Sequence, residues 1–186
     1  MRQDRVLLVE GPNDKFFFEA MCRSLGLSTI VKVASPQDIA GPKVFNNKGG
    51  IFKILPLLIS QMNDGSIASL GVIVDADTSA THGMGVEKTL ELFAQKIEKD
   101  GFRDRRRVGD QGGYVFKNND GLGDIGLWIM PDNQSEGMLE NWVYSTARGS
   151  ERADIAHAEK AIATLPGQIK FKEIHRIKAI TSVWMS

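Results

Sequence analysis

Two short apolar runs that each end in carboxylates constrain most strongly what this chain can fold into. Residues 6–9 (Val-Leu-Leu-Val) are followed by Glu10 and Gly11, and residues 71–74 (Gly-Val-Ile-Val) by Asp75-Ala76-Asp77. Runs of this length, rich in branched residues, are typical of buried β-strands. Open α/β sheets carry their ligand sites at the carboxyl ends of strands, so both acidic segments are expected at that edge.

Alternating strand and helix patterns in the first half of the chain predict an α/β fold. We expect strands at residues 5–10, 29–34 and 70–76, and helices at residues 13–25, 50–62 and 86–99. Asn13 is a suitable N-cap for the first helix and Gly26 a suitable stop. Residues 35–50 are typical of a loop, and Pro56 predicts a kink or a late start in the second helix. This order indicates a mainly parallel, Rossmann-like central sheet with helices on both faces.

The second half of the chain is less regular. Residues 101–113 are expected to form a turn, and strands at 114–116 and 125–130 are expected to pair across residues 117–124. Helical spacing follows at 135–144, 151–165 and 169–184. We expect a single domain over residues 1–186.

Composition narrows the functional classes. The chain has 186 residues and balances 23 basic against 23 acidic side chains, so any nucleic-acid partner must be held by a local patch. Its single cysteine, Cys22, excludes an intrachain disulfide and a CxxC zinc site. No apolar run approaches the roughly 18 residues of a membrane span, and residues 1–5 lack a signal-peptide core. A cytoplasmic protein without a membrane partner is therefore expected.

The Asp75-Ala76-Asp77 segment is the first candidate for chemistry. Residues two apart in a strand project to the same side, which would aim both carboxylates together and turn Ala76 toward the core. Clustered carboxylates, with few histidines nearby, favour Mg²⁺ or Mn²⁺ over zinc. An isolated Asp-x-Asp pattern is equally well explained by an aspartate that caps the chain at the strand end.

Glu10 and Asp14 add to the metal hypothesis. A charge directly after three apolar residues is costly unless Glu10 is exposed or paired. Asp14 falls in the first turn of the expected helix, where the helix dipole favours an anion, so ligation and charge complementation explain it equally.

Two basic segments are candidates for phosphate binding. Lys48-Gly49-Gly50 could offer backbone N–H groups at a helix N-terminus, although it lacks the spacing of a Walker A loop. Arg103 and its neighbours Arg105, Arg106 and Arg107 could hold a phosphate backbone. The flanking aspartates favour a solvated charged turn for these arginines instead.

Several of these segments resemble the motifs of the Toprim domain, the metal-binding α/β module of topoisomerases, bacterial primases and OLD-family nucleases. They are Val9-Glu10-Gly11 with Asp14, the Gly49-Gly50 element, and residues 72–77 (Val-Ile-Val-Asp-Ala-Asp). Residues 128–133 (Trp-Ile-Met-Pro-Asp-Asn), followed by residues 137–140 (Gly-Met-Leu-Glu), resemble a small family of stand-alone Toprim-like proteins of unknown function related to the OLD nucleases.

The resemblance implies a role for each matching residue. Glu10 would be the general acid/base or metal-bridging glutamate, with Asp75 and Asp77 as metal ligands. Asp14 would be a supplementary ligand. Glu140, preferred over Glu136 one turn earlier, would be the extra acid that holds a second metal. Lys178 would neutralise charge that develops on the phosphate.

The function implied is divalent-metal-dependent phosphodiester processing, as in an OLD-like nuclease acting on DNA or RNA with Mg²⁺ or Mn²⁺ as cofactor. Proteins that carry these motifs continue past the segment around Lys178, so the resemblance implies that residues 145–186 form an incomplete or variant extension. Any nucleotide-driven control would need a separate ATPase partner. The alternative is a non-catalytic module that binds nucleic acid or a nucleotide phosphate through the metal. A third hypothesis treats the carboxylates as unconnected loop residues, which would place Glu10 far from Asp75 and Asp77.

Overall fold

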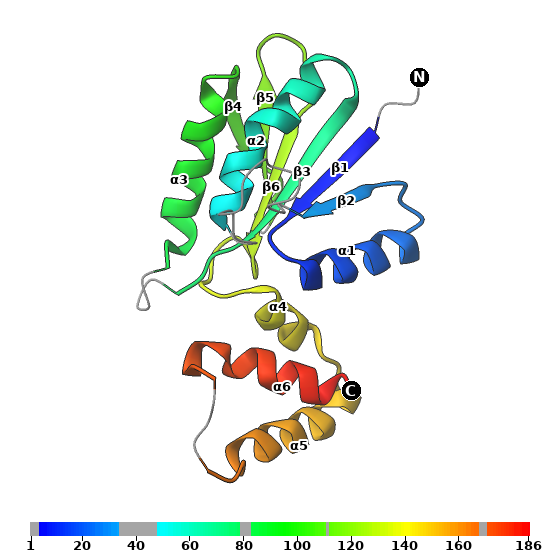
Figure 1. The fold of residues 1–186 in the computed structure, drawn as a ribbon, viewed down its shortest axis with the longest axis vertical. Coiled ribbons are helices and arrows are strands. Elements are labelled where there is room, and N and C mark those ends of the chain that lie inside the picture. The colour runs from blue at the N-terminus through cyan, green and yellow to red at the C-terminus, as the bar shows by residue number, and fades with distance from the viewer. Residues whose placement is uncertain (1–3, 34–47, 79–82, 111, 168–170) are drawn as a thin grey trace.

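Six strands form one sheet. The structure is a computed structural model, and it describes residues 4–33, 48–78, 83–110, 112–167 and 171–186. The strands are β1 (Asp4–Val9), β2 (Ile30–Val33), β3 (Ile67–Asp75), β4 (Phe102–Arg107), β5 (Tyr114–Asn118) and β6 (Ile125–Met130). They lie in the order β2-β1-β3-β6-β5-β4 (Figure 1). The first four are parallel and the last two run antiparallel to their neighbours, so the predicted α/β fold with a mainly parallel sheet is confirmed.

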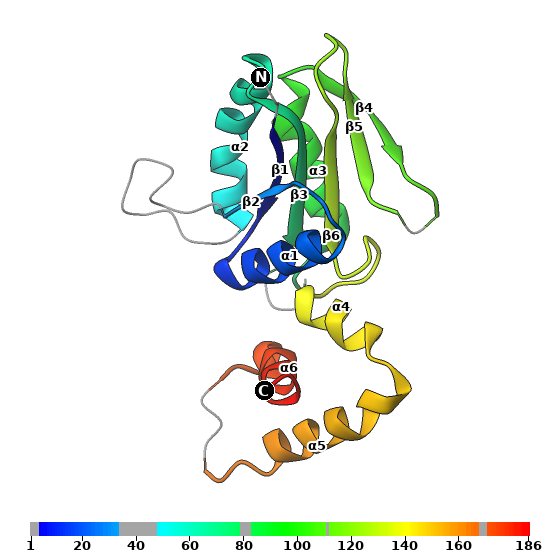
Figure 2. The same ribbon diagram turned by 90° about the vertical axis from the view of Figure 1, so that its right-hand side faces the viewer.

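Helices cover both faces of the sheet, as predicted. They are α1 (Pro12–Ser24), α2 (Lys48–Asn63) and α3 (Gly85–Glu98). Helix α1 packs on one face, and α2 and α3 pack on the other (Figure 2). The connections that leave β1 and enter β3 therefore run on opposite faces. This reversal makes the carboxyl ends of β1 and β3 a topological switch point, where open α/β sheets leave a crevice for ligands.

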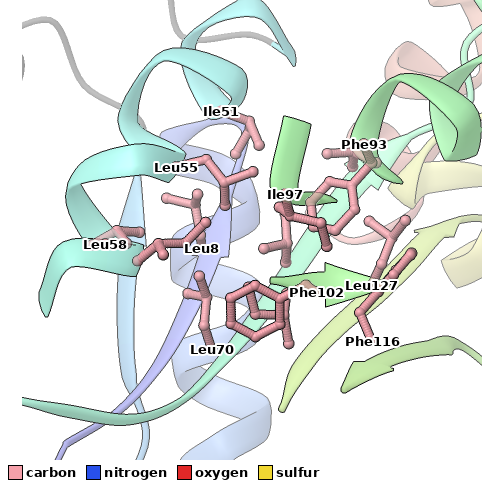
Figure 3. Close-up of a cluster of buried hydrophobic side chains, with 14 of the residues drawn as sticks. Leu8, Ile51, Leu55, Leu58, Leu70, Phe93, Ile97, Phe102, Phe116 and Leu127 are labelled. Carbon is pink, nitrogen blue, oxygen red and sulfur yellow. The ribbon is translucent and has the colours of Figure 1, made fainter. Parts of the chain in front are cut away.

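The main hydrophobic core lies between the sheet and helices α2 and α3. Leu8 from β1, Leu55 from α2 and Phe93 from α3 are all almost completely buried there (Figure 3). A smaller core lies under α1, where Phe18 and Cys22 pack against residues of β1, β2 and β6. Side chains of β3 face these two cores alternately, which is why the apolar run along this strand is nearly continuous.

The C-terminal part of the chain is a small helical unit at the carboxyl edge of the sheet (Figure 1). It contains α4 (Leu139–Thr146), α5 (Arg152–Ala163) and α6 (Arg176–Trp184), with short 3₁₀ turns η2 (Gly149–Glu151) and η3 (Glu173–His175). Helices α5 and α6 pack through Ala158, Ile162 and Ile180. Helix α6 contacts α4, and α4 contacts β6, so this unit lies against the end of the sheet. Among the described helices, none is long and apolar enough to cross a membrane.

Three expectations for the first half of the chain need correction. Gly11, not Asn13, is the N-cap of α1, because Pro12 has a backbone angle suited to the first helical position. Lys48-Gly49-Gly50 opens α2 instead of ending a loop, and Pro56 lies inside that helix, which does not start late. The rest of the expected loop, residues 35–47, lies outside the described residues, as does Ala34. Gly26 has a φ of +66° and follows α1 as predicted.

Two further corrections concern the second half. The arginine-rich segment is strand β4, not a turn, because Phe102 anchors its start in the core and its backbone pairs with β5. Residues 135–138 are not helical, and α4 begins at Leu139 after a turn that places Asn133 and Gly137 at positive φ. The predicted pairing of the strands at 114–116 and 125–130 is confirmed by β5 and β6.

Neighbouring leucines of α2 provide a test of the main core. Leu58 is 1% exposed against the sheet, whereas Leu57 is 49% exposed on the outer side of the same helix. We expect Leu58→Ala to lower the free energy of unfolding by about 3 kcal/mol, because a cavity remains where the side chain packed. Leu57→Ala should change it by less than about 0.5 kcal/mol. Urea unfolding measures both, and equal effects would contradict this packing.

Candidate functional site

A side-chain contact links the ends of β1 and β3. Glu10 directly follows β1, and its Oε1 accepts a hydrogen bond of 2.9 Å from the backbone N–H of Asp75, the last residue of β3. The strands are parallel neighbours, paired up to Leu8 and Val72, so the register brings their ends together. The two acidic segments predicted from the sequence therefore meet, which excludes the hypothesis that they are unconnected.

Asp75 also anchors the helical unit. Its Oδ1 accepts a hydrogen bond of 3.2 Å from the backbone N–H of Leu139, the first residue of α4. The free N–H groups and the dipole at a helix N-terminus favour a negative group at this position. One carboxylate thus fixes where α4 begins and, with it, the position of Glu140.

The Met-Pro-Asp-Asn segment shapes the turn between β6 and α4. Asn133 is 2% exposed, and its Oδ1 accepts a 2.7 Å hydrogen bond from the backbone of Ile129. Asp132 accepts hydrogen bonds from the next turn of backbone, including one of 3.0 Å from Gln134. This turn brings the backbone of Gly137 beside that of Asp77, and the two residues form an isolated antiparallel bridge. The segment therefore positions the site, a role that the sequence alone did not indicate.

Asp77 lies beyond the end of β3, although its charge still acts on Glu10 and Asp75. Strand β3 ends at Asp75, and Asp77 has a φ of +60°, so the alternation of a strand no longer applies. Its carboxylate Oδ2 lies 2.9 Å from Nζ of Lys48. Ala76, between the two aspartates, is completely buried as expected.

Lys48 is engaged inside the protein. It is 6% exposed, and besides its ion pair with Asp77 it donates hydrogen bonds to the carbonyl of Ala76 at 3.3 Å and to Oγ1 of Thr89 at 3.4 Å. Sequence reasoning placed Lys48 near phosphate and missed this ion pair. The only sequence feature that pointed to burial of Lys48 was its position directly before the apolar face of the expected helix. Gly49 and Gly50 lie in the first turn of α2.

Asp14, Glu140 and Lys178 complete the site from three different helices. Oδ2 of Asp14 accepts a 2.8 Å hydrogen bond from the backbone of Gly11, which supports the charge-complementation role at the start of α1. Oε1 of Glu140 lies 3.6 Å from Nζ of Lys178, a residue of α6. The charges of Glu140 and Lys178 both act on Asp14, so all three lie at the same edge. The helical unit therefore brings Lys178 to the same edge of the sheet as Asp14 and Glu140.

Burial and mutual repulsion raise the pKa values of three carboxyl groups at the site. Burial raises the pKa of Glu10 to about 7, against the lowering effects of the Asp75 N–H and of Lys48. Burial, followed by the charges of Glu10 and Asp14, raises the pKa of Asp75 to about 8. The pKa of Asp14 is also raised, chiefly by burial. Each raised pKa shows that burial disfavours the ionised carboxylate, and a bound cation would favour that ionised form.

The carboxylates at this edge suit an open magnesium or manganese site better than a site in which protein side chains supply every ligand. Among the described residues, no group of three or more His, Cys, Asp or Glu side chains is arranged to hold a metal ion. Mg²⁺ is commonly held by one or two carboxylates, with waters and substrate phosphates as its other ligands. Glu10 and Asp75 fit that pattern, whereas Asp77 and Glu140 are each paired with a lysine.

Comparison with known proteins identifies a family for the chain but no characterised relative. Residues 4–186 match the model of DUF3226, described as a protein of unknown function. Because the match covers nearly the whole chain, the protein belongs to this family. No curated protein and no solved structure matches it.

The raised pKa values predict how stability depends on pH. In a buffer that contains a chelator, the free energy of unfolding should fall by several kcal/mol between pH 5 and pH 8. The folded protein binds more protons than the unfolded chain here, because Glu10 and Asp75 titrate at about 7 and about 8 instead of 4.5 and 3.8. This stabilisation is complete below the unfolded values and is lost as the pH rises through the folded ones.

Urea unfolding at each pH measures that slope. Glu10→Gln and Asp75→Asn should each flatten it, because an amide does not titrate. Glu91→Gln, at an exposed position of α3, should leave it unchanged. A wild-type profile that is flat or rises over this range would contradict the assigned environments.

The Lys48 ion pair predicts a stability difference within one helix. Lys48→Met should lower the free energy of unfolding by about 2 kcal/mol, because Ala76 and Asp77 lose a buried donor. The side chain of Asp77 is 41% exposed, so hydration limits the loss. Lys53→Met, at an exposed position of α2, is the matched control. Equal urea midpoints for the two variants would show that the ion pair contributes nothing.

Proposed function

We propose that this protein is a Toprim-like, divalent-metal-dependent phosphodiesterase that acts on nucleic acid, with Mg²⁺ or Mn²⁺ held by Glu10 and Asp75. One observation carries the proposal, namely the hydrogen bond from the backbone N–H of Asp75 to the Glu10 carboxylate at the switch point of a mainly parallel sheet. Ligands of open α/β sheets bind at such points. A buried acidic pair of this kind attracts a hard cation.

The arrangement of strands supports the Toprim-like part of the proposal. The motif glutamate follows β1 and the motif aspartate ends β3, and these strands are parallel neighbours. The turn after β6 and helix α4 then bring Glu140 to the same edge, which matches the order of the resembling segments along the chain.

Glu10 is suited to proton transfer. With a pKa of about 7, it can hold or release a proton at neutral pH, which is where general acid/base catalysis is most efficient. Its Oε1 is fixed by the backbone of Asp75, so the group is oriented as well as tuned. A bound divalent ion would supply Lewis-acid activation of the phosphate.

Lys178 is suited to binding the phosphate. Its side chain is 46% exposed and its Nζ lies 3.6 Å from Glu140, a contact that leaves the ammonium open to solvent on its other sides. A phosphate that enters the site could share this cation, which would offset charge gained on the phosphate oxygens during displacement. Lys48 is buried; it donates a hydrogen bond to Asp77, and its charge also acts to lower the pKa of Glu10.

A second candidate function is metal-dependent binding of nucleic acid or a nucleotide phosphate without turnover. It is favoured by the lysine partners of Asp77 and Glu140, which leave fewer carboxylates for a second ion. Retention of a labelled oligonucleotide in Mg²⁺ or Mn²⁺, with no product after long incubation, would support this function over hydrolysis.

Cleavage assays on isosteric variants test the catalytic proposal. Glu10→Gln and Asp75→Asn should each reduce Mn²⁺- or Mg²⁺-dependent cleavage of DNA or RNA by about 100-fold or more. Both replacements keep an oxygen that can accept the hydrogen bonds from Asp75 and Leu139, so the fold should survive. Glu91→Gln is the control and should cleave like the wild type. Wild-type protein without activity on any substrate, or variants as active as wild type, would refute the proposal.

A further inference from the structure

Strand β4 concentrates positive charge at one edge of the sheet. It carries Arg103, Arg105, Arg106 and Arg107 against one aspartate, and all of these side chains are exposed. Within the described residues, none of the four arginines forms an ion pair. Arg107 lies over the ring of Tyr114, 5.8 Å from its centroid, so an aromatic side chain of β5 supports its guanidinium.

The register of the sheet places Arg106 on the same face as the candidate site. Arg106 pairs with Val115 in β5, Val115 with Gly126 in β6, and Gly126 with Gly71 in β3. Asp75 lies four residues beyond Gly71 in the same strand, and side chains an even number of residues apart share a face. Arg106 and Asp75 therefore project from one side of the sheet.

The same register gives the span between the two features. Arg106 pairs with Val115, and Val115 with Gly126, whereas Asp75 pairs with Met130 four residues further on. Three strand spacings and four residue rises separate Arg106 from Asp75, about 14 Å across the sheet and about 13 Å along it. The direct span is about 19 Å, or roughly six base steps of one strand of B-form DNA.

The part of this face on β4 and β5 is open, whereas helices α1 and α4 pack against Ile73 and Trp128 toward Asp75. Helix α1 covers the β1 and β2 side of this face, and Figure 2 shows strands β4 and β5 with no helix in front of them. A side chain at Gly126 would meet no atom within 4 Å, so this face is open at that position of β6. Exposed Lys117, opposite Asp104 in the register, adds a further cation on this face.

We propose that the end of β4 formed by Arg105, Arg106 and Arg107 is a second contact for nucleic acid, which binds phosphates of the strand whose phosphodiester lies at Glu10 and Asp75. This inference rests on the proposed function and adds where the polymer runs. Guanidinium groups bind phosphate in a forked geometry, and arginines that alternate between faces can follow a backbone around the sheet edge. The contact reads no sequence, because it reaches phosphates and not bases.

Charges on an edge strand also serve to prevent pairing between sheets, and any charged residue serves that purpose. Replacement of arginine by glutamate keeps a charged edge but reverses its sign. The two roles are therefore separable by experiment.

The test is binding of fluorescein-labelled single-stranded DNA, duplex DNA and RNA of about 30 nucleotides, measured by anisotropy in EDTA across a salt series. Arg105→Gln/Arg106→Gln should weaken binding by about tenfold and reduce the slope of log affinity against log salt by about 1.5. Arg105→Glu/Arg106→Glu should weaken it further. Lys160→Glu, at an exposed position of α5, should bind like the wild type. Melting temperatures confirm that each variant is folded.

Wild-type affinity and slope in the glutamine variant would overturn the inference, as would a wild-type protein that binds none of the three probes. Self-association of the glutamine variant with unchanged binding would assign the arginines to edge protection instead. Loss of binding in the arginine variants, in a protein that cleaves nothing, would refute the proposed hydrolysis and support this contact. Glu10→Gln should bind in EDTA at least as tightly as wild type.

Discussion

The hydrogen bond from the Asp75 backbone to the Glu10 carboxylate is the contact on which the rest of this site depends. It joins two strand ends that lie 65 residues apart in sequence, where the connections made by the described helices α1 and α2 lie on opposite faces of the sheet. An acid buried at that position is costly unless its oxygen has a donor, and here the partner strand supplies one. Asp75 then accepts a hydrogen bond from α4, so the pair also determines where the C-terminal helices attach.

Charge at this edge is only partly balanced by the protein itself. Two lysines from distant parts of the chain approach the outer carboxylates, Lys48 at Asp77 and Lys178 at Glu140. The inner pair, Glu10 and Asp75, keeps pKa values raised by burial. The inner pair is therefore the better candidate for a metal ion. Asp77 and Glu140 are better assigned to holding Lys48 and Lys178 in place. A hard ion that keeps most of its waters needs no more than two such carboxylates.

The sequence predicts those parts of the site that local features of the chain determine, and it does not predict those that depend on contacts with distant segments. Glu10 and Asp75 were predictable, because a carboxylate that ends an apolar strand can be located from periodicity and the edge rule for parallel sheets alone. The orientation of Asp77 was not, because its positive φ and its partner Lys48 arise from contacts with Gly137 and α2. The sequence did not predict strand β4, for another reason. A run of arginines has no hydrophobic period, and pairing with β5 alone makes it a strand.

Direct observation of a bound ion tests the central claim. Crystals soaked in a few millimolar Mn²⁺ would be measured at an X-ray energy where manganese scatters anomalously. The account predicts an anomalous peak at the carboxyl edge of β1 and β3, about 2.2 Å from oxygens of Glu10 and Asp75. The peak should be absent from crystals of Asp75→Asn soaked in the same way. An empty edge in the wild-type crystal, or a peak that persists in the variant, would contradict a metal site built on this pair.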